Sequence, residues 1–177
     1  MARCNVLVDK RTPEFVGNQN ALSKARKDIE SICASLGFIP NTIVTKSFSV
    51  RLFAYMYNMF QYLKAIAKTP RSSNVCIQFP APFSRTTYYK WFILAARFRQ
   101  CKICLIVHDV EFLRYHSNEK QAEIEMLNMA DRVIVHTEAM KLALKQMGVK
   151  ADMTVLNLFD YCTDSRLPNK VPMFVIY

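Results

Sequence analysis

A histidine and an aspartate stand side by side where an apolar run in the middle of the chain ends. His108 closes the run 102–108, whose composition is typical of a buried strand, and Asp109 follows it. An imidazole titrates near neutral pH and can take a proton from a hydroxyl group, and a neighbouring carboxylate can orient the imidazole or take the proton itself. The pair predicts general-base chemistry, with Asp109 and His108 as candidate catalytic residues. One alternative stays open, in which His108 caps a sheet edge and Asp109 caps the next turn.

Other chemically capable side chains also stand at the ends of predicted strands. In an open parallel sheet, ligands bind outside the carboxyl ends of the strands, so residues at these ends are expected to surround one site. Thr137 has a second interpretation as the N-cap of the helix that follows it. The candidate binding residues are Asp9, Lys10, Gln78, Phe79, Phe83, His136 and Thr137.

Several cofactor chemistries are excluded by what the chain lacks. It has 3 Gly in 177 residues, and no glycine-rich loop of the dinucleotide-binding or P-loop type follows any predicted strand. Cys101 and Cys104 resemble a metal or redox pair, but no second pair stands at zinc-site spacing, and residues three apart on a strand face opposite sides. We expect these cysteines to pack in the interior, and we expect no metal and no bound cofactor.

Short apolar runs alternate with longer amphipathic ones along most of the chain. The apolar runs predict strands, and the runs of helical periodicity predict helices, two of which end before Gly37 and Gly148 as expected of C-terminal caps. The predicted strands are 4–8, 38–45, 75–79, 102–108, 132–136 and 154–156. The predicted helices are 20–36, 50–68, 86–99, 119–129 and 138–147.

This alternation predicts an α/β fold, a Rossmann-like doubly wound parallel sheet covered on both faces, as a single domain. We expect that domain to span residues 1–158, followed by a linker at 159–172. The apolar segment 173–177 is expected to begin a further domain of a longer parent sequence. No apolar stretch reaches the length of about 20 residues that spans a bilayer.

The charge is uneven, and one predicted helix is unusually apolar. Residues 1–102 carry 16 basic and 4 acidic side chains, a balance that favours anionic partners. Among these, nucleic acid is the weaker option, because no recognition motif accompanies the basic residues.

The helix at 50–68 has a narrow polar stripe of Asn58, Gln61 and Lys68. We expect its broad apolar surface to be mainly core, with part of it free to contact a lipid-linked ligand or a membrane surface.

The segment from Leu105 to Val110, with its His-Asp pair, is followed at 123–137 by a Leu-Asn-x-Ala-Asp helix and a strand that ends in His136-Thr137. In this pattern, and in 21–38 and 77–80, the chain resembles the N-terminal half of GT-B glycosyltransferases. More narrowly, it is similar to the bacterial galactofuranosyltransferase-like and adhesin-glucosyltransferase-like group.

The resemblance implies a two-domain enzyme in which this half binds the acceptor and a missing half binds a nucleotide-sugar donor. Asp109 or His108 is then the base, and the isolated chain is expected to be inactive. The expected partners are a glycan, lipid-linked or glycoprotein acceptor but no nucleic acid, and a homo-oligomer stays open. The expected location is cytoplasmic, with peripheral contact at the inner membrane face left open. The alternative function is a non-catalytic binding module that docks on a donor-binding subunit.

Overall fold

We analysed a computed structural model of the chain, which describes residues 4–11, 21–46, 48–80, 86–108, 110 and 120–156. The strands are β1 (Cys4–Arg11), β2 (Ile39–Thr45), β3 (Asn74–Phe79), β4 (Lys102–Val107), β5 (Arg132–Val135) and β6 (Asp152–Val155). The helices are α1 (Ala21–Ser35), α2 (Arg51–Lys68), α3 (Thr86–Phe98), α5 (Lys120–Asn128) and α6 (Glu138–Gln146). Every predicted strand and helix within these ranges is confirmed.

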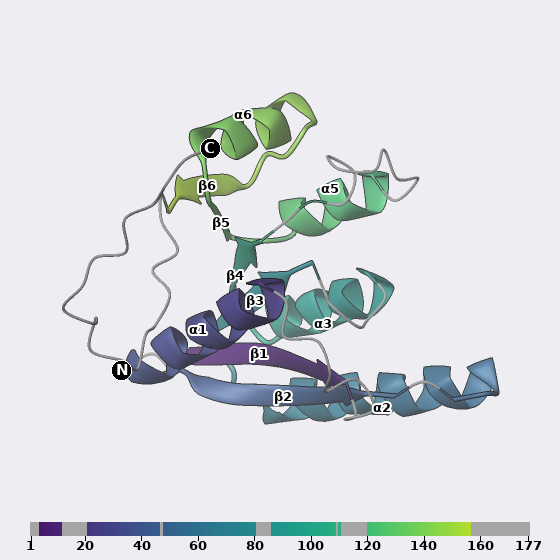
Figure 1. Ribbon diagram of the computed structural model, residues 1–177. Coiled ribbons are helices and arrows are strands. Elements are labelled where there is room, and N and C mark those ends of the chain that lie inside the picture. Colours follow the sequence, from purple (N-terminus) through teal and green to yellow (C-terminus); the bar gives the residue numbers. More distant parts are fainter. Residues whose placement is uncertain are drawn as a thin grey trace, which may run out of the picture.

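The six strands form one parallel sheet in the order β2-β1-β3-β4-β5-β6 (Figure 1). The order changes direction between β1 and β3, because the chain first steps outward to β2 and then returns past β1. This confirms the predicted Rossmann-like, doubly wound α/β domain. The glycine caps are confirmed as well, since Gly37 and Gly148 have φ values of 82° and 98°, in the left-handed region where a glycine carries no steric penalty.

The helices divide unequally between the two faces of the sheet. Buried side chains of α2, α3, α5 and α6 join one face of the sheet in a single large core, with Phe92 and Leu127 among its fully buried members. On the other face a small cluster joins Ile29 and Cys33 of α1 to Cys76 and Ile106 of the sheet. A right-handed crossover puts a helix on one face when the chain moves one way along the sheet and on the other face when it moves back, so only α1 lies on the second face among the described helices.

Part of that second face forms an open groove rather than a covered core. The groove holds about 810 Å³ and runs between α1 and the strands β3 to β5. It is lined mainly by apolar side chains, among them Ile32, Leu36, Ile134 and Leu156. The prediction of a sheet covered on both faces therefore holds for β1 and β3 but not for the described part of the second face over β5.

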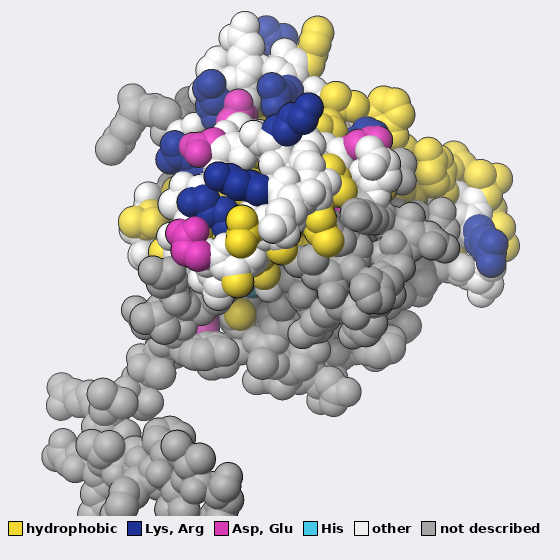
Figure 2. Space-filling model, turned by 90° about the horizontal axis from the view of Figure 1, so that it is seen from above, with side chains coloured by type: hydrophobic (Ala, Val, Ile, Leu, Met, Phe, Trp, Pro, Cys, Tyr) yellow, Lys and Arg dark blue, Asp and Glu magenta, His cyan; other side chains and the backbone are white. Residues whose placement is uncertain are grey.

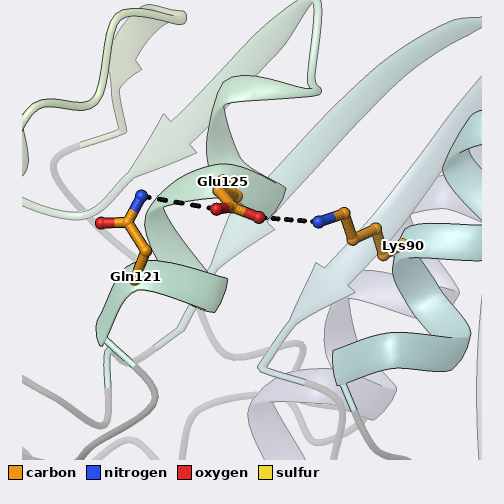
Figure 3. Close-up of polar contacts among 3 residues, drawn as sticks. All are labelled: Lys90, Gln121 and Glu125. Atoms are coloured by element: carbon orange, nitrogen blue, oxygen red, sulfur yellow. Dashed lines mark hydrogen bonds and ion pairs between the residues drawn. The ribbon is translucent and has the colours of Figure 1, made fainter.

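An ion pair joins two neighbouring helices at the surface of the large core. Lys90 Nζ of α3 lies 2.7 Å from Glu125 Oε2 of α5, and Gln121 Nε2 donates to Glu125 Oε1 at 3.4 Å (Figure 3). Both partners of the ion pair are about half exposed, so it contributes little to stability, as surface pairs generally do.

The interpretation of α2 as mainly a core helix is wrong. Only Tyr62 and Ala65 of this helix are buried, and they lie in its second half. The first half extends past the end of the sheet (Figure 1). Asn58 of the predicted polar stripe points inward, because its side-chain amide bonds the backbone of Lys46 through both its oxygen and its nitrogen.

The predicted linker 159–172 and the apolar segment 173–177 lie outside the described residues. None of the described helices combines the length and the hydropathy that crossing a bilayer requires.

Candidate functional site

Two predicted residues, His108 and His136, meet at the carboxyl edge of the sheet. They directly follow the adjacent strands β4 and β5, and Ile106 pairs with Ile134, so the two histidines reach the same level two residues further on. Alternation along a strand points both side chains to the face that α1 covers. Their ring centroids lie 5.9 Å apart, and both side chains are half-buried.

Gln78 of β3 connects this pair to α1. Its Oε1 lies 2.7 Å from His108 Nε2, and its Nε2 donates to the backbone oxygen of Arg26 at 3.3 Å. Because the amide nitrogen faces a carbonyl, the amide oxygen must accept from the imidazole. The hydrogen-bond network therefore assigns the proton of neutral His108 to Nε2 and leaves Nδ1 as the unprotonated nitrogen.

Arg26 of α1 is a further member of the site that the sequence pattern did not indicate. Its guanidinium donates to the backbone oxygen of Pro80, which follows a cis peptide bond with Phe79. Arg26 therefore joins α1 to the turn after β3, next to Gln78. In the sequence Arg26 stands among other basic residues, 52 positions before Gln78. No sequence spacing therefore identifies it as a member of the site.

The surroundings keep both imidazoles neutral. Burial, with the positive charge of Arg26 and then of His136 added, lowers the pKa of His108 to about 3. Burial also lowers the pKa of His136. Desolvation disfavours the charged form of a histidine, so at neutral pH both rings present an uncharged donor and acceptor.

This shift has a consequence for stability at acidic pH. The pKa of His108 is lower in the folded chain than the ordinary 6.5, so the unfolded state binds the extra proton more readily. We expect the free energy of unfolding to be unaffected by this group above pH 6.5 and to fall as the pH drops from 6.5 towards 3. Urea titrations at several pH values measure the slope of the unfolding free energy against pH. His108→Gln should reduce that slope by up to about 1.4 kcal/mol per pH unit, which is the slope produced by the uptake of one proton on unfolding. Equal slopes for both proteins would contradict the lowered pKa.

The structure assigns other positions to two of the predicted binding residues. Phe79 is 2% exposed in the large core, so its side chain lies away from any surface ligand, although its carbonyl accepts from the backbone N–H of His108 at 2.8 Å. The hydroxyl of Thr137 accepts from the backbone N–H of Met140 at 3.0 Å and caps α6. The N-cap interpretation of Thr137 is thus confirmed, and its exposed position still borders His136 in the chain.

Four predicted site residues are described less fully. Asp9 and Lys10 lie near the carboxyl end of β1, paired with Ile43 and Val44 of β2, at the same edge of the sheet as the two histidines. The side chains of Asp9 and Lys10 are outside the description. Asp109 and Phe83 lie outside the described residues, and their placement in the site stays a prediction.

The cysteines of the described region pack as predicted. Cys101 lies in the large core, whereas Cys104 lies on the opposite face of the sheet, beside its register partner Cys76 and near Cys33 of α1. Hydrogen bonds with the Cys104 and Cys33 thiols, together with burial, raise the pKa of Cys76, which therefore stays a thiol. These four thiols are free, and no group of three His, Cys, Asp or Glu side chains in the described ranges could hold a metal ion.

The edge therefore offers the imidazole of His108, the amide of Gln78 and Arg26 in one hydrogen-bonded unit, with the imidazole of His136 beside it. Such groups donate to and accept from hydroxyl groups, and the unprotonated Nδ1 of His108 is an acceptor for a hydroxyl proton. The arrangement suits a ligand rich in hydroxyl groups.

Comparisons with known proteins identify the family of the chain but not its ligand. No curated protein matches the chain. A family model described as "Glucosyltransferase 3-like, N-terminal domain" matches residues 14–158, which include α1, Gln78 and both histidines. Because this match covers well over half of the 177 residues, the chain belongs to the family of glucosyltransferase 3-like N-terminal domains.

Proposed function

We propose that this chain is the acceptor-binding half of a glycosyltransferase of the GT-B type. The observation that carries the proposal is the hydrogen-bonded unit of Gln78 and His108, with His136 beside it, at the carboxyl edge of the parallel sheet. Membership in a glucosyltransferase-like family supports a sugar as the group that is transferred. The acceptor is a glycan, or a glycan carried by a lipid or a protein.

The proposed reaction is a single displacement at the anomeric carbon of a nucleotide sugar. The acceptor oxygen forms a bond to that carbon while the bond to the diphosphate breaks, and the nucleoside diphosphate leaves with the electron pair. The acceptor proton passes to the carboxylate of Asp109, which follows His108 in the chain. His108, with its lowered pKa, is a weak base at neutral pH, so we give it the role of holding the acceptor hydroxyl by a hydrogen bond.

The donor is bound by a second domain in this proposal. The chain has no glycine-rich phosphate loop after any predicted strand, and the groups at the described edge are suited to hydroxyl groups more than to a diphosphate. The isolated chain should therefore bind acceptor without turning it over.

Acceptor binding by the isolated chain tests this proposal directly. Titration calorimetry with a panel of oligosaccharides should find at least one ligand, and His136→Ala should weaken its binding by about tenfold, which corresponds to about 1.4 kcal/mol. The matched control is Asn128→Ala, since this amide bonds the backbone around Gly148, at the opposite edge of the sheet. The control should leave the dissociation constant unchanged.

Two results would contradict the proposal. One is the absence of binding to every glycan combined with tight binding of a nucleotide sugar. The other is a stable complex with a donor-binding subunit in which the His136→Ala substitution has no effect on glycan binding or turnover, as expected of a non-catalytic module.

A further inference from the structure

Helix α2 carries an apolar stripe on its solvent side. The stripe residues recur at intervals of three and four along the helix, so they lie on one face. Three of them, Phe53, Met56 and Phe60, have 60–62% of their surface exposed. We call this face the outer stripe, and its members are Leu52, Phe53, Met56, Phe60 and Leu63.

Asn58, a polar side chain near the middle of this helix, points inward rather than towards water. Asn58 Oδ1 accepts from Lys46 N at 3.0 Å, and Asn58 Nδ2 donates to Lys46 O at 3.1 Å. In the second half, Tyr62 is buried against the rings of Tyr88 and Tyr89 of α3. These contacts fix the rotation of α2 about its axis. The outer stripe lies on the other side of the helix and therefore faces away from the core.

The chain segment that contains the outer stripe is basic. Residues 31–108 contain ten Lys or Arg and no Asp or Glu. On α2 itself, Lys64 and Lys68 are exposed beside the stripe, and Arg51 is exposed at the helix start. A second copy of this face would bring like charges together, so the charge disfavours self-association through the stripe and favours an anionic partner.

We propose that the outer stripe and its flanking basic residues form a docking site for an anionic lipid surface. Hydrophobic side chains, drawn in yellow, gather at the right-hand end of the molecule, where α2 extends past the sheet, and a basic side chain lies beside them (Figures 1 and 2). A helix with exposed Phe, Met and Leu on one face and Lys or Arg beside it lies in the plane of a membrane interface rather than across it.

The position of α2 determines which edge of the sheet would face the lipid surface. In a parallel α/β sheet each helix begins where the preceding strand ends, so the exposed start of α2 lies at the carboxyl edge, which also carries His108 and His136. Docking through the outer stripe brings that edge towards the lipid surface. The contact itself rests on the outer stripe and its charge and not on the proposed glycosyl transfer.

Vesicle co-sedimentation of the whole chain tests the proposal. We expect binding to vesicles of phosphatidylcholine with phosphatidylglycerol, at least tenfold weaker binding to phosphatidylcholine alone, and a loss of affinity as salt is raised. Each basic side chain near an anionic surface contributes about fivefold in affinity, so the double variant Lys64→Glu and Lys68→Glu should lose more than tenfold. The double variant Met56→Glu and Phe60→Glu should lose binding to both kinds of vesicle.

The matched control is Leu142→Glu, which places the same charge on an exposed leucine of α6. This variant should bind vesicles like the unmodified chain, and circular dichroism should show that all variants keep their helix content. A second reporter is Phe60→Trp in a Trp91→Phe background, which leaves one tryptophan, on the outer stripe. Its emission should move to shorter wavelength with anionic vesicles.

Three outcomes would overturn the proposal. The first is no vesicle binding by the unmodified chain. The second is equal loss of binding in Leu142→Glu and in the stripe variants. The third is a concentration-dependent dimer in light scattering that the stripe variants abolish while vesicle binding is absent, because this would assign the outer stripe to a second copy of the chain.

Discussion

Replacing Asp109 by Asn should lower the turnover number for sugar transfer by about 10²–10⁴-fold, the range that a positioned general base contributes. The measurement requires the chain joined to the donor-binding domain that the proposed function assigns to a second half, at saturating donor and acceptor. Under the proposed mechanism the acceptor proton passes to the Asp109 carboxylate, and an amide of the same shape cannot take it. The Michaelis constant for the acceptor should change little, because Asn keeps the size and most of the hydrogen bonding of Asp.

The control for this prediction is a carboxylate outside the site. Glu125→Gln removes a charge on α5 that pairs only with neighbouring surface groups in Figure 3, and turnover should stay within twofold of the unmodified enzyme. Turnover of Asp109→Asn within the same limit would remove Asp109 from the mechanism. If His108→Gln alone then caused a large loss of turnover, Nδ1 of His108 would be identified as the general base instead.

Replacing Tyr62 by Ala should lower the free energy of unfolding by about 3–5 kcal/mol, as for other large aromatic residues removed from a core. Tyr62 is 1% exposed, its ring stacks on Tyr88 at a centroid distance of 5.3 Å, and it meets Tyr89 edge-on at 5.8 Å. The substitution therefore removes both the ring contacts and the buried area, and it leaves a cavity between α2 and α3. Urea unfolding followed by circular dichroism measures the change.

The same helix offers a matched control with the same chemical change. Tyr55 also contacts the ring of Tyr88, at 5.8 Å, but it is 49% exposed. Tyr55→Ala should cost less than about 1 kcal/mol, in the range of substitutions on the protein surface. Equal losses in the two variants would mean that α2 is not held by its second half, and the assignment of the outer stripe to solvent would fail with it.

The orientation of α2 shows why its surface could not be derived from its sequence. Apolar side chains occur on nearly the whole circumference of this helix, so its periodicity marked only a narrow polar stripe that includes Asn58 and Gln61. The side of a helix that becomes buried depends on which elements lie beside it. Here the backbone of Lys46, twelve residues away, binds the Asn58 amide and turns this side inward.

The error at Phe79 has a different origin, because the signal was present in the sequence. Gln78 and Phe79 are neighbours on one strand, and neighbouring strand residues point to opposite faces. Both could therefore not line the same site. The structure places Gln78 against His108 and places Phe79 in the large core, and the alternation of the apolar residues in β3 would have favoured that choice.

The sequence by itself determined the order of strands and helices, the parallel doubly wound class and the strand ends at which Gln78, His108 and His136 stand. These features depend on local periodicity and on right-handed crossovers, which operate within a few tens of residues. Only the tertiary structure decided that Arg26 joins the site, that the proton of His108 sits on Nε2, and that α2 presents its apolar face outward. Each of these depends on contacts between segments far apart in the chain or on burial, and neither is encoded in the spacing of neighbouring residues.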